Sequence, residues 1–149
     1  MILASSWAGM SGMMVGSGTT RLKVVGLSQS GIRFLSRWMA RSLSFVIADG
    51  RSYLSGDEHT MDMAEFFILR KYRRQGIGYR VASFIFDLFP SKWEVRQLGL
   101  NADAQTFWRK VINRYTNNQF YEISWNKERS SGVAQLFNNT IATSKTRYV

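Results

Sequence analysis

The chain has 149 residues, with no cysteine, one histidine (His59), and 20 lysines and arginines against 10 acidic residues. These counts exclude a disulfide framework, a cysteine nucleophile, an Fe–S cluster and an all-histidine metal site, and we expect no metal. The length suits one folded domain with a core of its own. The net charge of +10 favours an anionic partner, which composition leaves open between nucleic acid, a membrane surface and a phosphate-bearing cofactor.

The positive charge is concentrated in one short segment. Residues 61–149 hold fourteen basic and seven acidic side chains, and five of the basic ones lie within 70–80. No stretch is apolar for long enough to predict a membrane span, and the first residues lack the basic region of a signal peptide. We therefore expect a cytoplasmic protein whose excess charge is local.

Regular structure is predicted from residue 44 onward. Residues 1–31 are rich in Gly, Ser and Met and show no sustained hydrophobic period, apart from an apolar run at 22–27. The predicted elements are strands at 44–48 and 61–69, a helix at 81–88 before Pro90, a strand at 93–98, a helix at 104–115, and strands at 120–125 and 133–137 joined by a turn at 130–132. This β-β-α-β-α-β-β order predicts an α+β fold with a mixed sheet.

A basic, glycine-containing turn, Arg73-Arg74-Gln75-Gly76-Ile77-Gly78, joins the second strand to the first helix. Its glycines remove side chains, so that a bulky anion can approach the backbone. The N–H groups at a helix N-terminus are unpaired and lie at the positive end of the helix dipole, and the neighbouring arginines, including Arg80, add charged donors. These features predict a phosphate site, with an ordinary strand-to-helix turn as the alternative.

Two better-known phosphate motifs do not fit this turn. A Walker loop would continue as Gly-Lys-Ser or Gly-Lys-Thr, and no such triplet follows. The dinucleotide-binding pattern would require a glycine where the chain has Val81. The turn therefore belongs to neither of these two phosphate motifs.

Two motifs resemble the GNAT N-acetyltransferase superfamily. Arg73-x-x-Gly76-x-Gly78 after an apolar strand is similar to motif A of that family, and Asn101-x-x-Ala104-x-x-Phe107-Trp108 is similar to its Asn-x-x-Ala-x-x-Phe-Tyr signature. The resemblance covers residues 44–138 and implies the acyl-CoA N-acyltransferase fold. It divides the chain into an atypical segment at 1–43, a GNAT core at 44–138 and a C-terminal tail at 139–149.

The resemblance also implies a reaction and a cofactor site. The activity would be transfer of acetyl from acetyl-CoA to a primary amine by direct attack, on an acceptor that the sequence does not identify. The backbone of Phe67, Ile68 and Leu69 would pair with the pantetheine arm where two neighbouring strands separate, and Asn101 would also contact pantetheine. The pyrophosphate would be bound by the loop residues Arg73, Arg74, Gln75, Gly76, Ile77, Gly78, Tyr79 and Arg80.

Direct attack needs a base that keeps the amine neutral, and the strand before the loop offers two carboxylates. Asp62 lies nearer the position that family members often use, and Glu65 is the second candidate. Strand alternation puts the two on opposite faces unless a bulge intervenes, so that only one would face the cleft. The alternative is a surface carboxylate in each case, and His59 is a third, less favoured base in a polar loop.

The residue at the position of the proton donor for the leaving thiolate differs from the family pattern. Members that use an acid usually carry tyrosine where this chain has Trp108, and an indole N–H does not supply a proton at neutral pH. Trp108 also lies on the apolar stripe of its helix, which favours a packing role. Tyr79, Tyr115 and Tyr121 are substitutes without positional support, and the thiolate could also leave unassisted.

The N-terminal part does not match the family, which begins β-α-α-β before the strand at 44–48. Trp38-Met39-Ala40 can only be encoded as TGG-ATG-GCN, and reading one base earlier gives Val, Leu or Met followed by Asp-Gly. The same frame allows Pro-Phe-Leu-Ile for residues 33–36 and Lys-Ile for 41–42, which resembles the family's strand at this point. Residues up to about 43 are therefore either translated out of frame or a divergent N-terminus, and the acceptor site would be incomplete in either case.

Two other functions remain open from the sequence. One is a GNAT-like protein that binds CoA without turnover, and the other is a basic nucleic-acid-binding module that uses tryptophans and arginines. The arginines cluster beside the loop rather than along a stripe, which makes nucleic acid the less favoured partner. An incomplete sheet edge near residue 44 would favour a homodimer.

Overall fold

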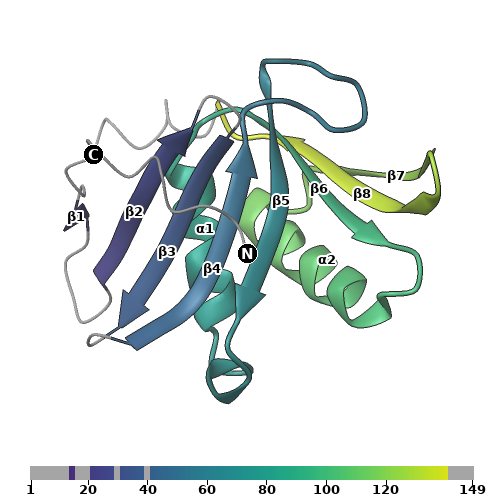
Figure 1. Ribbon diagram of the computed structural model, residues 1–149. Helices are drawn as coiled ribbons and strands as arrows, with labels where there is room; N and C mark the ends of the chain where they lie inside the picture. Colours follow the sequence, from purple (N-terminus) through teal and green to yellow (C-terminus); the bar gives the residue numbers. More distant parts are fainter. Residues whose placement is uncertain (1–13, 16–20, 29–30, 39–40, 141–149) are drawn as a thin grey trace.

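Figure 1 shows the computed structural model, which describes residues 14–15, 21–28, 31–38 and 41–140, with side chains from Ser44 onward. Residues 1–13 of the expected N-terminal segment and most of the expected tail, 141–149, lie outside the described residues. No helix in the described part is both long and apolar enough to cross a membrane.

The described strands form one sheet in the order β1-β2-β3-β4-β5-β6-β8-β7. The strands are β1 (Met14–Val15), β2 (Arg21–Ser28), β3 (Gly31–Trp38), β4 (Arg41–Asp49), β5 (Thr60–Ile68), β6 (Lys92–Leu98), β7 (Tyr121–Lys127) and β8 (Ser130–Asn138). The helices are η1 (Arg70–Tyr72), a single 3₁₀ turn, α1 (Ile77–Leu88) and α2 (Ala102–Thr116). Neighbouring strands are antiparallel except β5 and β6, which are parallel because α1 crosses between them.

The β-β-α-β-α-β-β order predicted from residue 44 is confirmed, as β4, β5, α1, β6, α2, β7 and β8. The predicted incomplete edge near residue 44 is wrong, because β3 pairs with β4 through Ser36 and Ser44 and neighbouring positions. Upstream of β4, the described residues contain strands and no helix, and the apolar run at 22–27 lies in β2. The expectation of a homodimer rested on this edge, which β3 occupies.

The predicted turn at 130–132 is also wrong. The hairpin turns at Glu128 and Arg129, between the end of β7 and the start of β8, and Glu128 adopts the positive φ of 56°. Gly132 lies inside β8, where an added Cβ would come within 1.9 Å of the Gln97 carbonyl oxygen of β6. The glycine therefore permits the close approach of β8 to β6 and takes no part in the turn.

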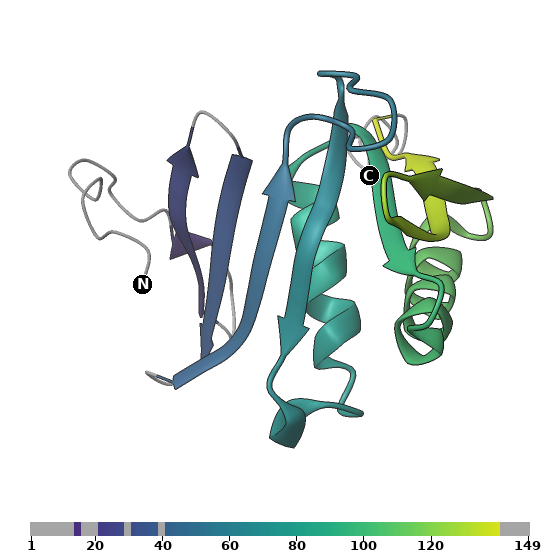
Figure 2. The ribbon, with the colours of Figure 1, turned by 45° about the vertical axis from the view of Figure 1, so that its right-hand side comes forward.

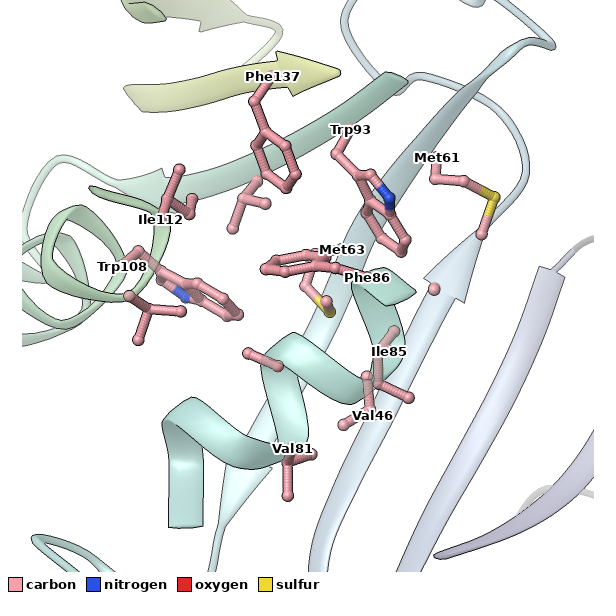
Figure 3. Packing of buried hydrophobic residues seen from close by; sticks show 14 of the residues in the cluster. Val46, Met61, Met63, Val81, Ile85, Phe86, Trp93, Trp108, Ile112 and Phe137 are labelled. Carbon is pink, nitrogen blue, oxygen red and sulfur yellow. The ribbon is translucent and has the colours of Figure 1, made fainter. Parts of the chain in front are cut away.

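Both α-helices cover the same face of the sheet, and the core lies between them and the strands (Figures 1 and 2). Phe86 of α1 is fully buried at its centre, with ring centroids 4.9 Å from Trp93 and Phe137, 5.0 Å from Tyr115 and 6.3 Å from Trp108. Figure 3 shows Phe86, Trp93, Trp108 and Phe137 converging from α1, α2 and the strands. This aromatic contact fixes α1 and α2 relative to β6.

The opposite face of the sheet, called the outer face below, is covered by no helix of the described residues (Figure 2). Apolar side chains are exposed there, including Phe45 of β4 and its cross-strand partner Phe67 of β5. The loop at 50–59 between β4 and β5 folds onto the β6–β8–β7 part of this face, through the contacts described below.

Candidate functional site

The parallel strands β5 and β6 are paired only at one end. Thr60, Met61 and Asp62 pair with Lys92, Trp93 and Glu94, and the ladder stops there. Beyond this point β5 continues beside β4 and β6 continues beside β8, so that the two strands diverge (Figure 1). No strand of the described residues pairs with this side of β5 after Asp62, which leaves backbone groups open to an extended ligand.

The loop after β5 supplies an array of unpaired backbone donors. The chain passes through η1, takes a positive φ of 61° at Arg74 and 72° at Gly76, and enters α1 at Ile77. The first helical bond runs from the Arg80 amide to the Gly76 carbonyl, at 3.2 Å. In the described part of the chain, no acceptor is bonded to the six amides at 74–79, so that they are available to an anion at the positive end of α1.

The two glycines of the loop are needed for different reasons. Gly76 holds its left-handed conformation with nothing within 4 Å of an added Cβ, so that backbone geometry alone requires glycine. At Gly78 an added Cβ would lie 2.9 Å from the Phe107 ring of α2. The expectation that both glycines make room for an anion is therefore corrected at Gly78, whose bare Cα accommodates a helix–helix contact.

The basic side chains of 70–80 are not neutralised within the described structure. None of the five forms an ion pair with a described carboxylate. Arg73 folds back onto the end of β5, where its Nε donates to the Ile68 carbonyl at 2.9 Å and its guanidinium lies 5.6 Å from the Phe67 ring centre. Arg73 thus occupies one of the backbone acceptors expected to pair with pantetheine, while Arg74 and Arg80 remain exposed beside the free amides.

Asn101 caps α2, and its Oδ1 accepts from the Ala104 amide at 3.1 Å. Its side-chain NH₂ has no hydrogen-bond partner among the described residues, and the residue is exposed just after the end of β6. The amide therefore remains free to donate to a ligand between the diverging strands.

The two candidate bases lie on one face of the sheet. Between Ile47 and Ala48 of β4 the register moves from Glu65 to Met63, so that Ala64 is an extra residue in β5. Met61 and Met63 point into the core before this bulge, and Ile68 does so after it. Asp62 and Glu65 consequently share the outer face, which is the bulged arrangement rather than the simple alternation.

Their surroundings are nevertheless very different. Asp62 is 3% exposed and accepts two hydrogen bonds from Arg96, from Nη2 at 2.6 Å and Nε at 3.2 Å. Burial raises the pKa of Asp62, and the Arg96 guanidinium opposes this rise. Glu65 is exposed and has no hydrogen-bond or ion-pair partner among the described residues.

Sequence reasoning did not identify Arg96 as a residue of the site. Its Nε also lies 3.2 Å from Glu94, so that one cation serves two buried carboxylates, and its guanidinium stacks 3.9 Å from the Tyr53 ring centre. Glu94 and Arg96 are two residues apart in β6, with Trp93 and Val95 at the alternate positions, which was the available signal for a charged pair on one face.

The same cluster fixes the loop at 50–59 to the sheet. Ser52 donates to Glu94 at 2.5 Å, and the Leu54 amide donates to the other oxygen of that carboxylate at 3.2 Å. Lys127 of β7 donates to the Tyr53 carbonyl at 2.6 Å. The loop is thereby held at three points, which gives the outer face a fixed wall.

The residues considered as acids and His59 differ in their surroundings. Trp108 is 5% exposed and packs edge-on against Phe66, at 4.8 Å between ring centroids, which confirms the packing interpretation. Tyr115 donates to Asp87 at 2.7 Å, and burial raises its pKa, so that it holds its proton. The Tyr79 ring lies 4.1 Å under the Arg114 guanidinium, and Tyr121 is exposed on β7. His59 is exposed in the loop.

The chain is similar to known proteins in structure and not in sequence. No protein-family model matches the sequence, and no curated protein matches it in sequence. Among solved structures, the Escherichia coli ribosomal-protein-S18-alanine N-acetyltransferase is similar at a TM-score of 0.56 and 13% identity, over 83% of this chain and 77% of that one.

Two further structures are similar at comparable levels. AAC(6')-Ib in complex with ribostamycin and coenzyme A has a TM-score of 0.59 and 12% identity, over 80% of this chain and 69% of that one. A spermidine N-acetyltransferase chimera from Vibrio cholerae and hSSAT has a TM-score of 0.54 and 11% identity, over 78% of this chain and 71% of that one. The chain therefore has the fold of the GNAT acetyltransferase superfamily.

Proposed function

We propose that the protein is a CoA-dependent N-acetyltransferase that transfers acetyl from acetyl-CoA to a primary amine. One observation carries the proposal: two binding features lie together in the structure. The β5 backbone is open beside the point where β5 and β6 diverge, and the six amides at 74–79 are unpaired. An extended pantetheine arm fits the first feature and a pyrophosphate fits the second. The uncompensated charge of Arg74 and Arg80 adds to the attraction of that anion.

The chain's own residues would bind and orient the two substrates. When bound, acetyl-CoA supplies an activated acetyl thioester. The backbone of Phe67, Ile68 and Leu69 and the side-chain amide of Asn101 would align the arm, and Arg73 would have to release the Ile68 carbonyl. A neutral amine then forms a C–N bond to the acetyl carbon as the C–S bond breaks, and one proton leaves its nitrogen.

Glu65 is the proposed base, and Asp62 the residue that holds Arg96 in place. Asp62 already accepts two hydrogen bonds from a guanidinium, which disfavours its taking a proton from an amine. Glu65 shares the outer face and is exposed, so that a proton can reach it directly or through water. With Trp108 in the core and Tyr115 bonded to Asp87, we propose that the thiolate leaves without a proton from α2.

The test is release of CoA thiol from acetyl-CoA in the presence of a panel of amines, together with titrations of acetyl-CoA and of short duplex DNA at low and moderate salt. We expect saturable CoA binding, DNA binding that salt removes, and thiol release with at least one amine. Saturable CoA binding without thiol release would identify a binding protein without turnover. Salt-resistant DNA binding without CoA binding would contradict the proposal.

A further inference from the structure

A groove of about 830 Å³ opens on the outer face, between the loop at 50–59 and the ends of β6, β8 and β7. Its volume is in the range that holds a small organic ligand. Glu94, Leu136 and Tyr121 form one cross-strand row along its floor, as their pairing in the ladders shows. The loop contributes Ser52, Leu54 and Asp57 as the facing wall.

The groove meets the place where β5 and β6 separate. Thr60 and Glu94, which line the groove, belong to the short stretch in which the two strands are still paired, and Asp62–Glu94 is its last rung. A thioester held between the diverging strands near this rung would face the groove. The loop wall is fixed by its bonds to Glu94 and Lys127, so that the groove exists before a ligand binds.

Apolar side chains of β7, β8 and the loop line the groove beside polar ones, and Asp57 and Glu94 are its two carboxylates. Ile123 is 41% and Tyr121 is 78% exposed on β7, and Leu54 of the loop and Leu136 of β8 add aliphatic surface. Glu94 is already engaged by Ser52, Leu54 and Arg96.

Asp57 supplies the remaining carboxylate. The His59 amide and the Thr60 hydroxyl donate to it, and these bonds lower its pKa, so that it stays anionic at neutral pH. The charge of Lys92, which also lines the groove, is a smaller cause of the lowered pKa of Asp57.

We propose that this groove binds the acceptor as a single primary amine carried on an apolar, ring-sized body; the inference rests on the proposed function. One ammonium group meets Asp57, and the body covers Tyr121 and Ile123. A polycation such as spermidine finds one available carboxylate here and approaches a chain of net charge +10. The acceptor class therefore differs from the spermidine and the ribostamycin named for two of the similar structures.

The experiment measures binding of four probes to the full chain by calorimetry, without CoA. The probes are phenethylamine, ethylamine, which lacks the ring, phenethyl alcohol, which lacks the charge, and spermidine. We expect phenethylamine to bind saturably and about tenfold more tightly than each of the others. Ile123→Ser, Tyr121→Ser and Asp57→Asn should each weaken it about fivefold.

Phe45→Ser is the matched control, because Phe45 is 40% exposed on the same face but does not line the groove. It should bind phenethylamine as the wild type does. Tighter binding of spermidine, no saturable binding of phenethylamine, or unchanged affinity in both β7 variants would overturn the inference. A parallel titration with acetyl-CoA separates the two proposals: lost CoA binding with intact phenethylamine binding contradicts the proposed function and leaves the groove as an amine site.

Discussion

At the scale of single residues, Gly78 shows how a motif position can serve packing rather than ligand binding. Changing Gly78 to Ala places a methyl group against the Phe107 ring, 2.9 Å from its nearest atom. We expect a loss of about 1 kcal/mol in the free energy of unfolding, measured by urea denaturation. In a Phe107→Leu background the same change should cost much less, because the ring edge is gone. An equal cost in both backgrounds would refute the assigned contact.

Kinetic measurements on variants distinguish the roles of the two carboxylates of β5, Asp62 and Glu65. Glu65→Gln should lower kcat about a hundredfold and leave the Kd of acetyl-CoA unchanged, because only proton removal is affected. Asp62→Asn should mainly lower stability, since it weakens the pair with Arg96. The readout is thiol release with whichever amine the panel identifies, at a temperature where both variants are folded. If Asp62→Asn abolishes kcat and Glu65→Gln does not, the base is Asp62.

At the scale of elements, Arg96 joins β5, β6 and the loop at 50–59. Changing Arg96 to Met leaves Asp62 and Glu94 buried without their cation, which should cost about 3 kcal/mol at neutral pH. The pKa of Asp62 is already raised by burial and would rise further without the guanidinium. A raised pKa in the folded state means that stability falls as pH rises from the usual value of this carboxyl to its folded value.

The cost of Arg96→Met should therefore shrink as pH falls through that window, when the folded protein takes up the proton. Urea unfolding at pH 5 and pH 7.5 measures the change. Arg109→Met is the control, because the Arg109–Glu122 pair is more exposed and its loss should cost clearly less stability than that of the Arg96 contacts. A pH-independent difference between Arg96→Met and the wild type would contradict the electrostatic explanation.

The order of elements from residue 44 and the identity of the loop could be predicted from the sequence, because apolar spacing and the glycine pattern are local signals. The bulge at Ala64 could not, since one extra residue leaves no mark in an apolar strand and is visible only in the pairing with β4. The predicted position of the hairpin turn is wrong because glycine is typical of turns. Gly132 is instead needed inside β8, where the Gln97 carbonyl of β6 leaves no room for a Cβ. The groove joins four separate segments and had no local signature.

At the scale of the whole molecule, one sheet carries helices on one face and a ligand-sized groove on the other. The cofactor would bind from the loop at the start of α1, and the acceptor would lie under the loop at 50–59, with the last β5–β6 rung between them. Upstream of β4 the described residues form strands instead of the helices expected of the family. The out-of-frame origin of residues up to about 43 stays a prediction, which resequencing of the gene tests.

The central claim is that the amides around Gly76 bind the pyrophosphate of CoA, and the most direct measurement is the Kd of acetyl-CoA for Gly76→Val. Valine strongly disfavours the φ of 72° found at Gly76, so that the amide array should be distorted. Gly56→Val is the matched control, because Gly56 has a φ of 77° and similar free space in a different loop. Calorimetry should show saturable binding to the wild type and Gly56→Val, and at least about tenfold weaker binding to Gly76→Val. Equal affinity of the two valine variants, or no saturable binding to the wild type, would contradict the account.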